Sequence, residues 1–131
     1  MAIVRLQDGR IRAVRVLLLE ESPDDCELAA HELRRDGFAV MTAHTALEAL
    51  ESARLARPDI ILANMSPEGL VFAAACKELP QLASVPIIGI TGHLDGLYSD
   101  ELTALSGGFQ KLLRKPLTLA VFRDAIARLF S

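Results

Sequence analysis

The sequence predicts an α/β fold, a single doubly wound domain in which a central parallel sheet of five strands carries helices on both faces. Short, almost continuously apolar segments alternate with helical patterns from residue 14 to the end of the chain. The length of 131 residues matches one domain. A hydrophobic fraction of 51% excludes disorder for the chain as a whole.

The five predicted strands are short apolar runs, each bounded by turn residues. Runs of this kind are typical of parallel strands that are buried on both faces. They cover residues 14–19, 39–43, 60–63, 86–91 and 111–113.

The first two predicted helices have clear start and stop signals. Ser22 can cap a helix that begins at Pro23 and ends at residues 34–36, with Gly37 as its C-terminal glycine. Thr45 can cap a second helix, which stops before Pro58.

Three further helices follow the later strands. Ser66 precedes a third helix that ends near residues 79–80, and residues 99–106 form a short fourth helix. Thr118 opens a last helix with apolar residues at helical spacing. Within the third helix, residues 70–76 are apolar all round, so one side is predicted to be core. The other side is either tolerant alanine or a partner surface.

Residues 1–13 stand outside this pattern and are predicted to be an extension of a domain spanning residues 14–131. The segments 3–6 and 11–14 flank a turn-like sequence that contains Gly9. Two alternatives remain open for them, a small hairpin and a frayed tail.

Charge and composition exclude several classes of partner and compartment. The chain has 14 Lys and Arg against 17 Asp and Glu, a net charge of −3, which predicts no binding to nucleic acid or to an anionic membrane. No apolar run approaches the roughly 20 residues of a membrane helix, and residues 1–10 lack a signal sequence. Cys26 and Cys76 are predicted to be reduced core thiols, which suits a cytoplasmic protein.

Polar side chains follow four of the predicted strands. Glu20 and Glu21 come after the first strand and Asn64 after the third. Thr91 ends the fourth, and Lys115 follows the fifth. Ligands of an open parallel sheet bind beyond the carboxyl ends of its strands, so these five residues are expected to form one site.

These residues and their flanking strands resemble the receiver domain of bacterial two-component response regulators. The resemblance covers almost the whole chain after residue 14 and rests on four segments in the family's order and spacing: residues 16–21, 58–64, 86–93 and 115–116. It implies a flavodoxin-like, chemotaxis-regulator-like fold with strand order 2-1-3-4-5. In that family an acidic pair holds Mg²⁺, an aspartate accepts a phosphoryl group from a histidine kinase, and a hydroxyl and a lysine bind its oxygens. The resemblance assigns these positions to Glu20 and Glu21, Asn64, Thr91 and Lys115.

The departures from the family pattern indicate a degenerate, or pseudo-, receiver. Asn64 replaces the acceptor aspartate, and an amide is a poor nucleophile. Glutamates replace the usual aspartates, so the Mg²⁺ site at Glu20 and Glu21 is expected to be weak or vestigial. Leu112 occupies the position of the aromatic switch residue, and Pro67 lies one residue closer to the acceptor position than usual.

The sequence therefore predicts a non-enzymatic, phosphorylation-incompetent receiver that works through protein contacts in a phosphorelay. Its expected partners are a histidine kinase, an output domain or a second copy of the chain. The alternative is a phosphorylatable receiver that uses another carboxylate or a deamidated Asn64. No phosphate-binding loop, nucleophile elbow or metal-ligand spacing is present, and His31, His44 and His93 are expected at the surface or at helix ends.

Overall fold

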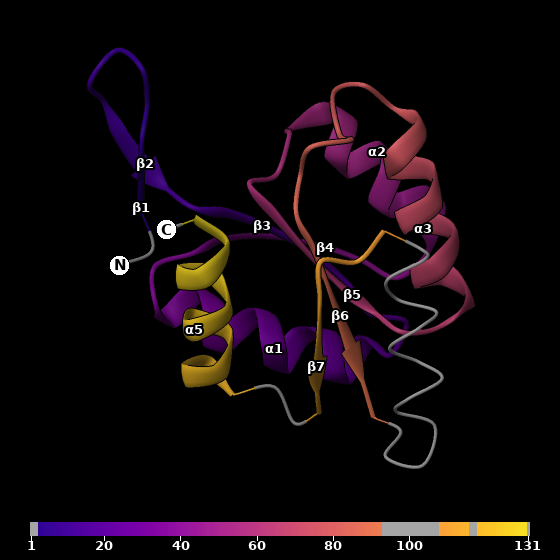
Figure 1. Ribbon diagram of the computed structural model, residues 1–131. Coiled ribbons are helices and arrows are strands. Elements are labelled where there is room, and N and C mark those ends of the chain that lie inside the picture. The colour runs from indigo at the N-terminus through magenta and orange to yellow at the C-terminus, as the bar shows by residue number, and fades with distance from the viewer. Residues whose placement is uncertain (1–2, 93–107, 116–117, 131) are drawn as a thin grey trace.

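The computed structural model describes residues 3–92, 108–115 and 118–130, and its centre is a parallel sheet of five strands (Figure 1). The spatial order of the strands is β4-β3-β5-β6-β7. Counted from the first strand of this sheet, the order is 2-1-3-4-5, as the resemblance implies; an N-terminal hairpin takes the labels β1 and β2. The strands are β3 (Arg15–Leu19), β4 (Ala39–Ala43), β5 (Ile60–Asn64), β6 (Ile87–Thr91) and β7 (Lys111–Arg114).

Helices cover both faces of the sheet, with α1 and α5 on one side and α2 and α3 on the other (Figure 1). They span Pro23–Arg35 (α1), Ala46–Leu55 (α2), Pro67–Glu78 (α3) and Leu119–Phe130 (α5). The helix expected at residues 99–106 lies outside the described residues, as does His93. Among the residues that the structure describes, no helix combines the length and apolar character needed to cross a membrane.

The predicted N-caps are confirmed. The side-chain oxygens of Ser22, Thr45 and Ser66 each accept a hydrogen bond from a backbone N–H three residues later, at 3.3, 3.1 and 3.2 Å. These bonds satisfy donors that a helix start otherwise leaves unpaired. At the other end of α1, Gly37 has a φ of 96°, the left-handed conformation that glycine adopts readily.

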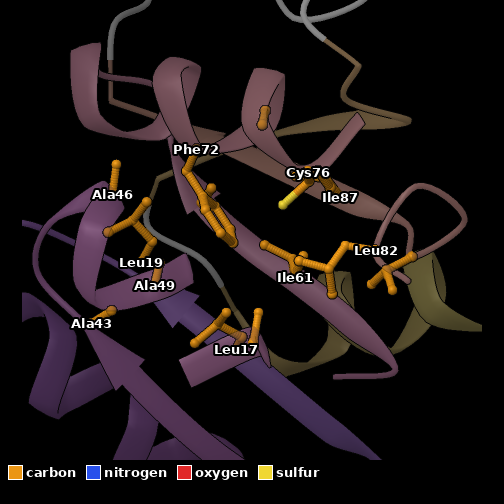
Figure 2. Packing of buried hydrophobic residues seen from close by; sticks show 14 of the residues in the cluster. Leu17, Leu19, Ala43, Ala46, Ala49, Ile61, Phe72, Cys76, Leu82 and Ile87 are labelled. Atoms are coloured by element: carbon orange, nitrogen blue, oxygen red, sulfur yellow. The ribbon is translucent and has the colours of Figure 1, made fainter. Parts of the chain in front are cut away.

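Two apolar cores lie on the two faces of the sheet. Successive residues of a strand point to opposite faces, so Leu17 packs under α2 and α3 while Leu18 packs under α1 and α5. Figure 2 shows the first core, where Phe72 of α3 lies against the sheet. In the second core, Phe38 and Phe122 make an edge-to-face contact with ring centroids 5.4 Å apart. Burial on both faces explains the continuous apolar runs of the strands.

Cys26 and Cys76 are free thiols in these cores, as predicted. Burial raises the pKa of the Cys76 thiol to about 12 and raises that of Cys26 as well. Because the thiolate is the reactive form, both side chains act as small apolar fillers rather than as nucleophiles.

The apolar third helix buries one side only. Phe72, Ala73 and Cys76 are buried, which confirms the predicted core face. Val71 is 58% exposed, and Ala74 is also exposed. Tolerant alanine and a partner surface both stay predictions for this side.

The N-terminal segment forms a hairpin, so the frayed-tail alternative is wrong. Strands β1 (Ile3–Arg5) and β2 (Ile11–Ala13) pair antiparallel and project from the body of the domain (Figure 1). The turn between them places Gly9 at a φ of 89°. A two-stranded hairpin is marginally stable by itself, so its attachment to the domain matters.

Arg12 attaches the hairpin to the domain through a forked ion pair with Asp59. Its Nη1 and Nη2 atoms donate to Oδ2 and Oδ1 of Asp59 at 2.7 and 2.9 Å, and the backbone N–H of Arg15 donates to Oδ2 at 2.7 Å. Burial by itself raises the pKa of the Asp59 carboxyl, but these hydrogen bonds and the charges of Arg12 and Arg15 outweigh it. The net pKa lies below the ordinary value of 3.8.

The variant Asp59→Asn is expected to lower the free energy of unfolding at pH 7 by about 1–3 kcal/mol, because charge-assisted hydrogen bonds are lost. The pKa of Asp59 is lower in the folded state than in the unfolded state. Its contribution is therefore complete above about pH 4 and disappears as the pH falls through the folded pKa. Urea denaturation at pH 7 and pH 3 should show a smaller gap between wild type and variant at pH 3.

The matched control is Asp8→Asn, which removes the hairpin's exposed Asp8–Arg10 pair and should change stability by only a few tenths of a kcal/mol. A gap for Asp59→Asn that is the same at both pH values would show that the ion pair contributes nothing.

Candidate functional site

The five predicted site residues lie at the carboxyl-end edge of the sheet. Glu20 and Glu21 directly follow β3, and Asn64 and Thr91 are the last residues of β5 and β6. Lys115 directly follows β7. Parallel pairing of β3 with β5, β5 with β6 and β6 with β7 places all of these strand ends on the same side.

Lys115 forms an ion pair with Glu20. Its Nζ lies 3.1 Å from Glu20 Oε2, and the Glu20 side chain is only 8% exposed against 33% for Lys115. The second carboxylate oxygen of Glu20 accepts from the backbone N–H of Ser22 at 3.2 Å. Both carboxylate oxygens of Glu20 are therefore engaged.

Asn64 points its amide at the other glutamate of the acidic pair. Its Nδ2 donates to Glu21 Oε1 at 3.3 Å, and its side chain is half-buried. The Asn64 backbone carbonyl accepts from the Ser66 hydroxyl at 3.4 Å. The side chain therefore lines the site, while the backbone takes part in the cap of α3.

Thr91 and Leu112 are the two residues that the sequence analysis assigns to the switch positions. Thr91 is 1% exposed, and its backbone carbonyl accepts from the Lys115 N–H at 2.7 Å, which fixes the start of the loop after β7. Leu112 packs over Gly89: a Cβ at residue 89 would lie 3.0 Å from Leu112 Cδ1. A leucine side chain packed against a glycine has no polar group that could move between a buried and an exposed position.

Gly69 is a site residue that the sequence analysis missed. A Cβ added there would lie 1.9 Å from the backbone oxygen of Asn64, so only glycine allows this approach of α3 to the end of β5. A glycine in the first turn of an otherwise apolar helix was the available signal, because glycine disfavours helix interiors.

Two more side chains support the site, His44 from the segment before α2 and Glu68 from the first turn of α3. The Nδ1 of His44 lies 2.9 Å from the Glu20 backbone carbonyl, a hydrogen bond that requires the proton on Nδ1. Glu68 Oε1 accepts from the backbone N–H of Ala46 at 2.8 Å and so links α3 to α2. His31 is exposed as expected, whereas His44 is half-buried and contacts the acidic pair's backbone.

The arrangement is a poor fit for Mg²⁺, which requires near-octahedral oxygen ligands. The carboxylate of Glu20 is already neutralised by the Lys115 ammonium, and that of Glu21 faces an amide N–H. Within the described part of the chain, no three His, Cys, Asp or Glu side chains are grouped so that they could hold a metal ion.

Fold and site together combine a five-stranded parallel sheet with an acidic pair, an asparagine and a paired lysine at its carboxyl edge. The chain belongs to the response regulator receiver domain family, whose pattern matches residues 16–127. Receiver domains of this family act in two-component signalling, where they interact with histidine kinases and output domains.

The chain is similar to three known proteins. It is 33% identical over 106 residues to the transcriptional regulatory protein CseB of Streptomyces coelicolor, covering 81% of this chain and 44% of that protein. The chain thus spans less than half the length of this relative. The chemotaxis protein CheY4 of Vibrio cholerae shares the fold with a TM-score of 0.81 and 24% identity, over 89% of this chain and 98% of that one.

The receiver domain of the sensor histidine kinase PA1611 from Pseudomonas aeruginosa is also similar. It is 25% identical, has a TM-score of 0.76, and covers 88% of this chain and 95% of its own. Its structure contains a magnesium ion coordinated in the active site cleft. Receiver domains can therefore bind Mg²⁺ in their active site.

Proposed function

We propose that this chain is an atypical receiver domain that takes up no phosphoryl group and acts through protein–protein contacts. The observation that carries the proposal is the amide at the acceptor position, with Asn64 Nδ2 donating to Glu21. A carboxylate oxygen attacks phosphorus with a free lone pair, whereas the lone pair of an amide nitrogen is delocalised into the carbonyl.

The ion pair of Lys115 supports the same proposal. In the family the lysine binds phosphoryl oxygens, but here its ammonium lies 3.1 Å from a nearly buried carboxylate. Drawing Lys115 away from Glu20 would leave that carboxylate without its counter-charge, which is costly at a buried position. The ammonium therefore neutralises the Glu20 carboxylate and is not free to bind a phosphoryl group.

Mg²⁺ is expected to bind in the millimolar range at best, an affinity worth about 4 kcal/mol. The reason is competition, because the cation has to displace or coexist with the Lys115 ammonium beside Glu20. A calorimetric titration of the purified protein with MgCl₂ measures this directly, with Glu20→Gln as a matched control that removes one ligand. A micromolar dissociation constant would contradict the expected weak binding of Mg²⁺.

The partners that we propose are a histidine kinase, an output domain or a second copy of the chain, bound without phosphorylation. A switch needs a ligand that distinguishes two conformations. In the family that ligand is the phosphoryl group, which Asn64 is not expected to accept. Leu112 also lacks the aromatic ring of the usual switch residue. The net charge of −3 argues against nucleic acid and anionic membranes as targets of this domain. We place the domain in the cytoplasm, where histidine kinases deliver phosphoryl groups.

The proposal is tested by incubating the protein with acetyl phosphate and Mg²⁺ and recording the intact mass. No stable phosphoryl adduct is expected, while a receiver that retains the acceptor aspartate should be labelled under the same conditions. The alternative acceptors, another carboxylate or a deamidated Asn64, predict a labelled species whose site peptide mapping identifies. Stoichiometric labelling of freshly prepared protein would overturn the proposal.

A further inference from the structure

A cavity of about 750 Å³ opens between α1 and α5, on the face of the sheet opposite α2 and α3. Its floor is apolar and is formed by Leu18, Ile90 and Phe122, all of them buried. The side chains of Leu28 and Leu119 also line it. Cavities of this size that are mostly apolar with a few polar groups are typical of sites for small organic molecules.

The charged groups around the cavity are mostly acidic. Glu20, Asp25 and Glu32 line it together with the single ammonium of Lys115. Lys115 is already paired with Glu20, so the carboxylates of Asp25 and Glu32 carry the remaining charge. They lie seven residues apart on α1, two turns along the same side of the helix and about 10 Å apart along its axis.

Neither remaining carboxylate has a strong partner. Glu32 reaches Arg35 at 3.7 Å, with both side chains more than half exposed, which makes a weak pair. Asp25 makes no ion pair with another described residue. Leu28 lies between them in sequence and is 66% exposed, so apolar surface at this site remains to be covered.

We propose that this cavity binds a small organic cation, a molecule with an apolar body and an ammonium or guanidinium head. The apolar body would cover Leu28 and rest on Phe122, and the head would face Asp25 or Glu32. An anion of the same shape would meet the field of both carboxylates and be repelled. None of these arguments involves Asn64, so the proposal is independent of phosphorylation at the acceptor position.

The cavity also reaches the candidate site, because Glu20 and Lys115 line both. A cation bound beside this ion pair changes the electrostatic environment of the two residues that hold the carboxyl edge together. Occupancy of the cavity would therefore be felt at the site where a typical receiver is phosphorylated, and a small molecule could replace the phosphoryl group as the input.

The experiment uses three probes of one shape: 4-phenylbutylamine, 4-phenylbutan-1-ol and 4-phenylbutanoate, each titrated into ¹⁵N-labelled protein at pH 7. The amine should give saturable amide shifts on α1 and α5 with a dissociation constant of roughly 1 mM or lower. The alcohol should bind several-fold more weakly and the carboxylate at least about tenfold more weakly. Equal affinities for amine and carboxylate, or shifts that map to other elements, would overturn the proposal.

Substitutions at two exposed positions test the charge contact and the apolar contact separately. Asp25→Asn should weaken the amine several-fold and leave the alcohol unchanged, whereas Asp24→Asn, in the same helical turn but outside the cavity, should change neither. Leu28→Gln should weaken amine and alcohol alike, with Leu47→Gln on α2 as its exposed control. If the double variant Asp25→Asn with Glu32→Gln binds the amine as tightly as Asp24→Asn does, the charge argument is wrong.

Discussion

The variant Asn64→Asp is expected to accept a phosphoryl group from acetyl phosphate that the parent protein does not accept. Aspartate has nearly the shape of asparagine, so its carboxylate would stand where the amide now faces Glu21. Carboxylate attack on phosphorus forms the acyl phosphate as acetate leaves. The added negative charge also strengthens the site for Mg²⁺. Intact-mass measurement before and after incubation with acetyl phosphate and Mg²⁺ reads out the gain.

Two controls make this result specific. Asn64→Gln keeps an amide at the position and should remain unlabelled. The double variant Asn64→Asp with Lys115→Met should label more slowly or less, because it lacks the cation that binds phosphoryl oxygens in the family. A folded Asn64→Asp variant that stays unlabelled would show that more than the acceptor has been lost from the site.

The variant Lys115→Met is expected to cost about 2–3 kcal/mol of unfolding free energy. It leaves the Glu20 carboxylate, which is 8% exposed, without its counter-charge. Breaking a fully buried pair costs about 3–5 kcal/mol, and the value is lower here because the Lys115 side chain is one-third exposed. Urea denaturation at pH 7 measures the difference, with Lys111→Met at the start of β7 as the control.

A double-mutant cycle shows whether the cost belongs to the pair. Glu20→Gln removes the charge but keeps a hydrogen-bonding oxygen, so combining it with Lys115→Met should recover part of the lost stability. If Lys115→Met is no less stable than Lys111→Met, the ion pair is structurally neutral, and the lysine is as available for a phosphoryl group as in a typical receiver.

The helix starts were predictable from the sequence because their causes are local. Ser22, Thr45 and Ser66 each bond to a backbone N–H three residues away, so the signal and its effect lie within one turn. The hairpin was not predictable in this way. Its anchor joins Arg12 to Asp59 across 47 positions, and nothing in the local sequence of residues 1–13 distinguishes an anchored hairpin from a free one.

The placement of the five candidate residues at one edge was predictable, but their pairings were not. Alternation of strands and helices places the five residues at one edge, because parallel strands end together. The sequence does not show that Glu20 turns to Lys115 while its neighbour Glu21 turns to Asn64, since adjacent residues after a strand leave in different directions. The close approach of Gly69 to Asn64 depends on the angle at which α3 meets β5, which is also a tertiary property.

The anchored hairpin makes contacts with the domain from outside the segment that this chain shares with its family. The segment shared with other receivers begins at residue 16, yet Arg12 and Arg15, which hold the Asp59 carboxylate, both precede it. A chain that began at residue 16 would lack both arginines and would leave the Asp59 carboxylate, 15% exposed, without them. Asp59 directly precedes the central strand β5, and Asn64 is the last residue of that strand. In this receiver, the family boundary therefore separates Asp59 from the two arginines that donate hydrogen bonds to it.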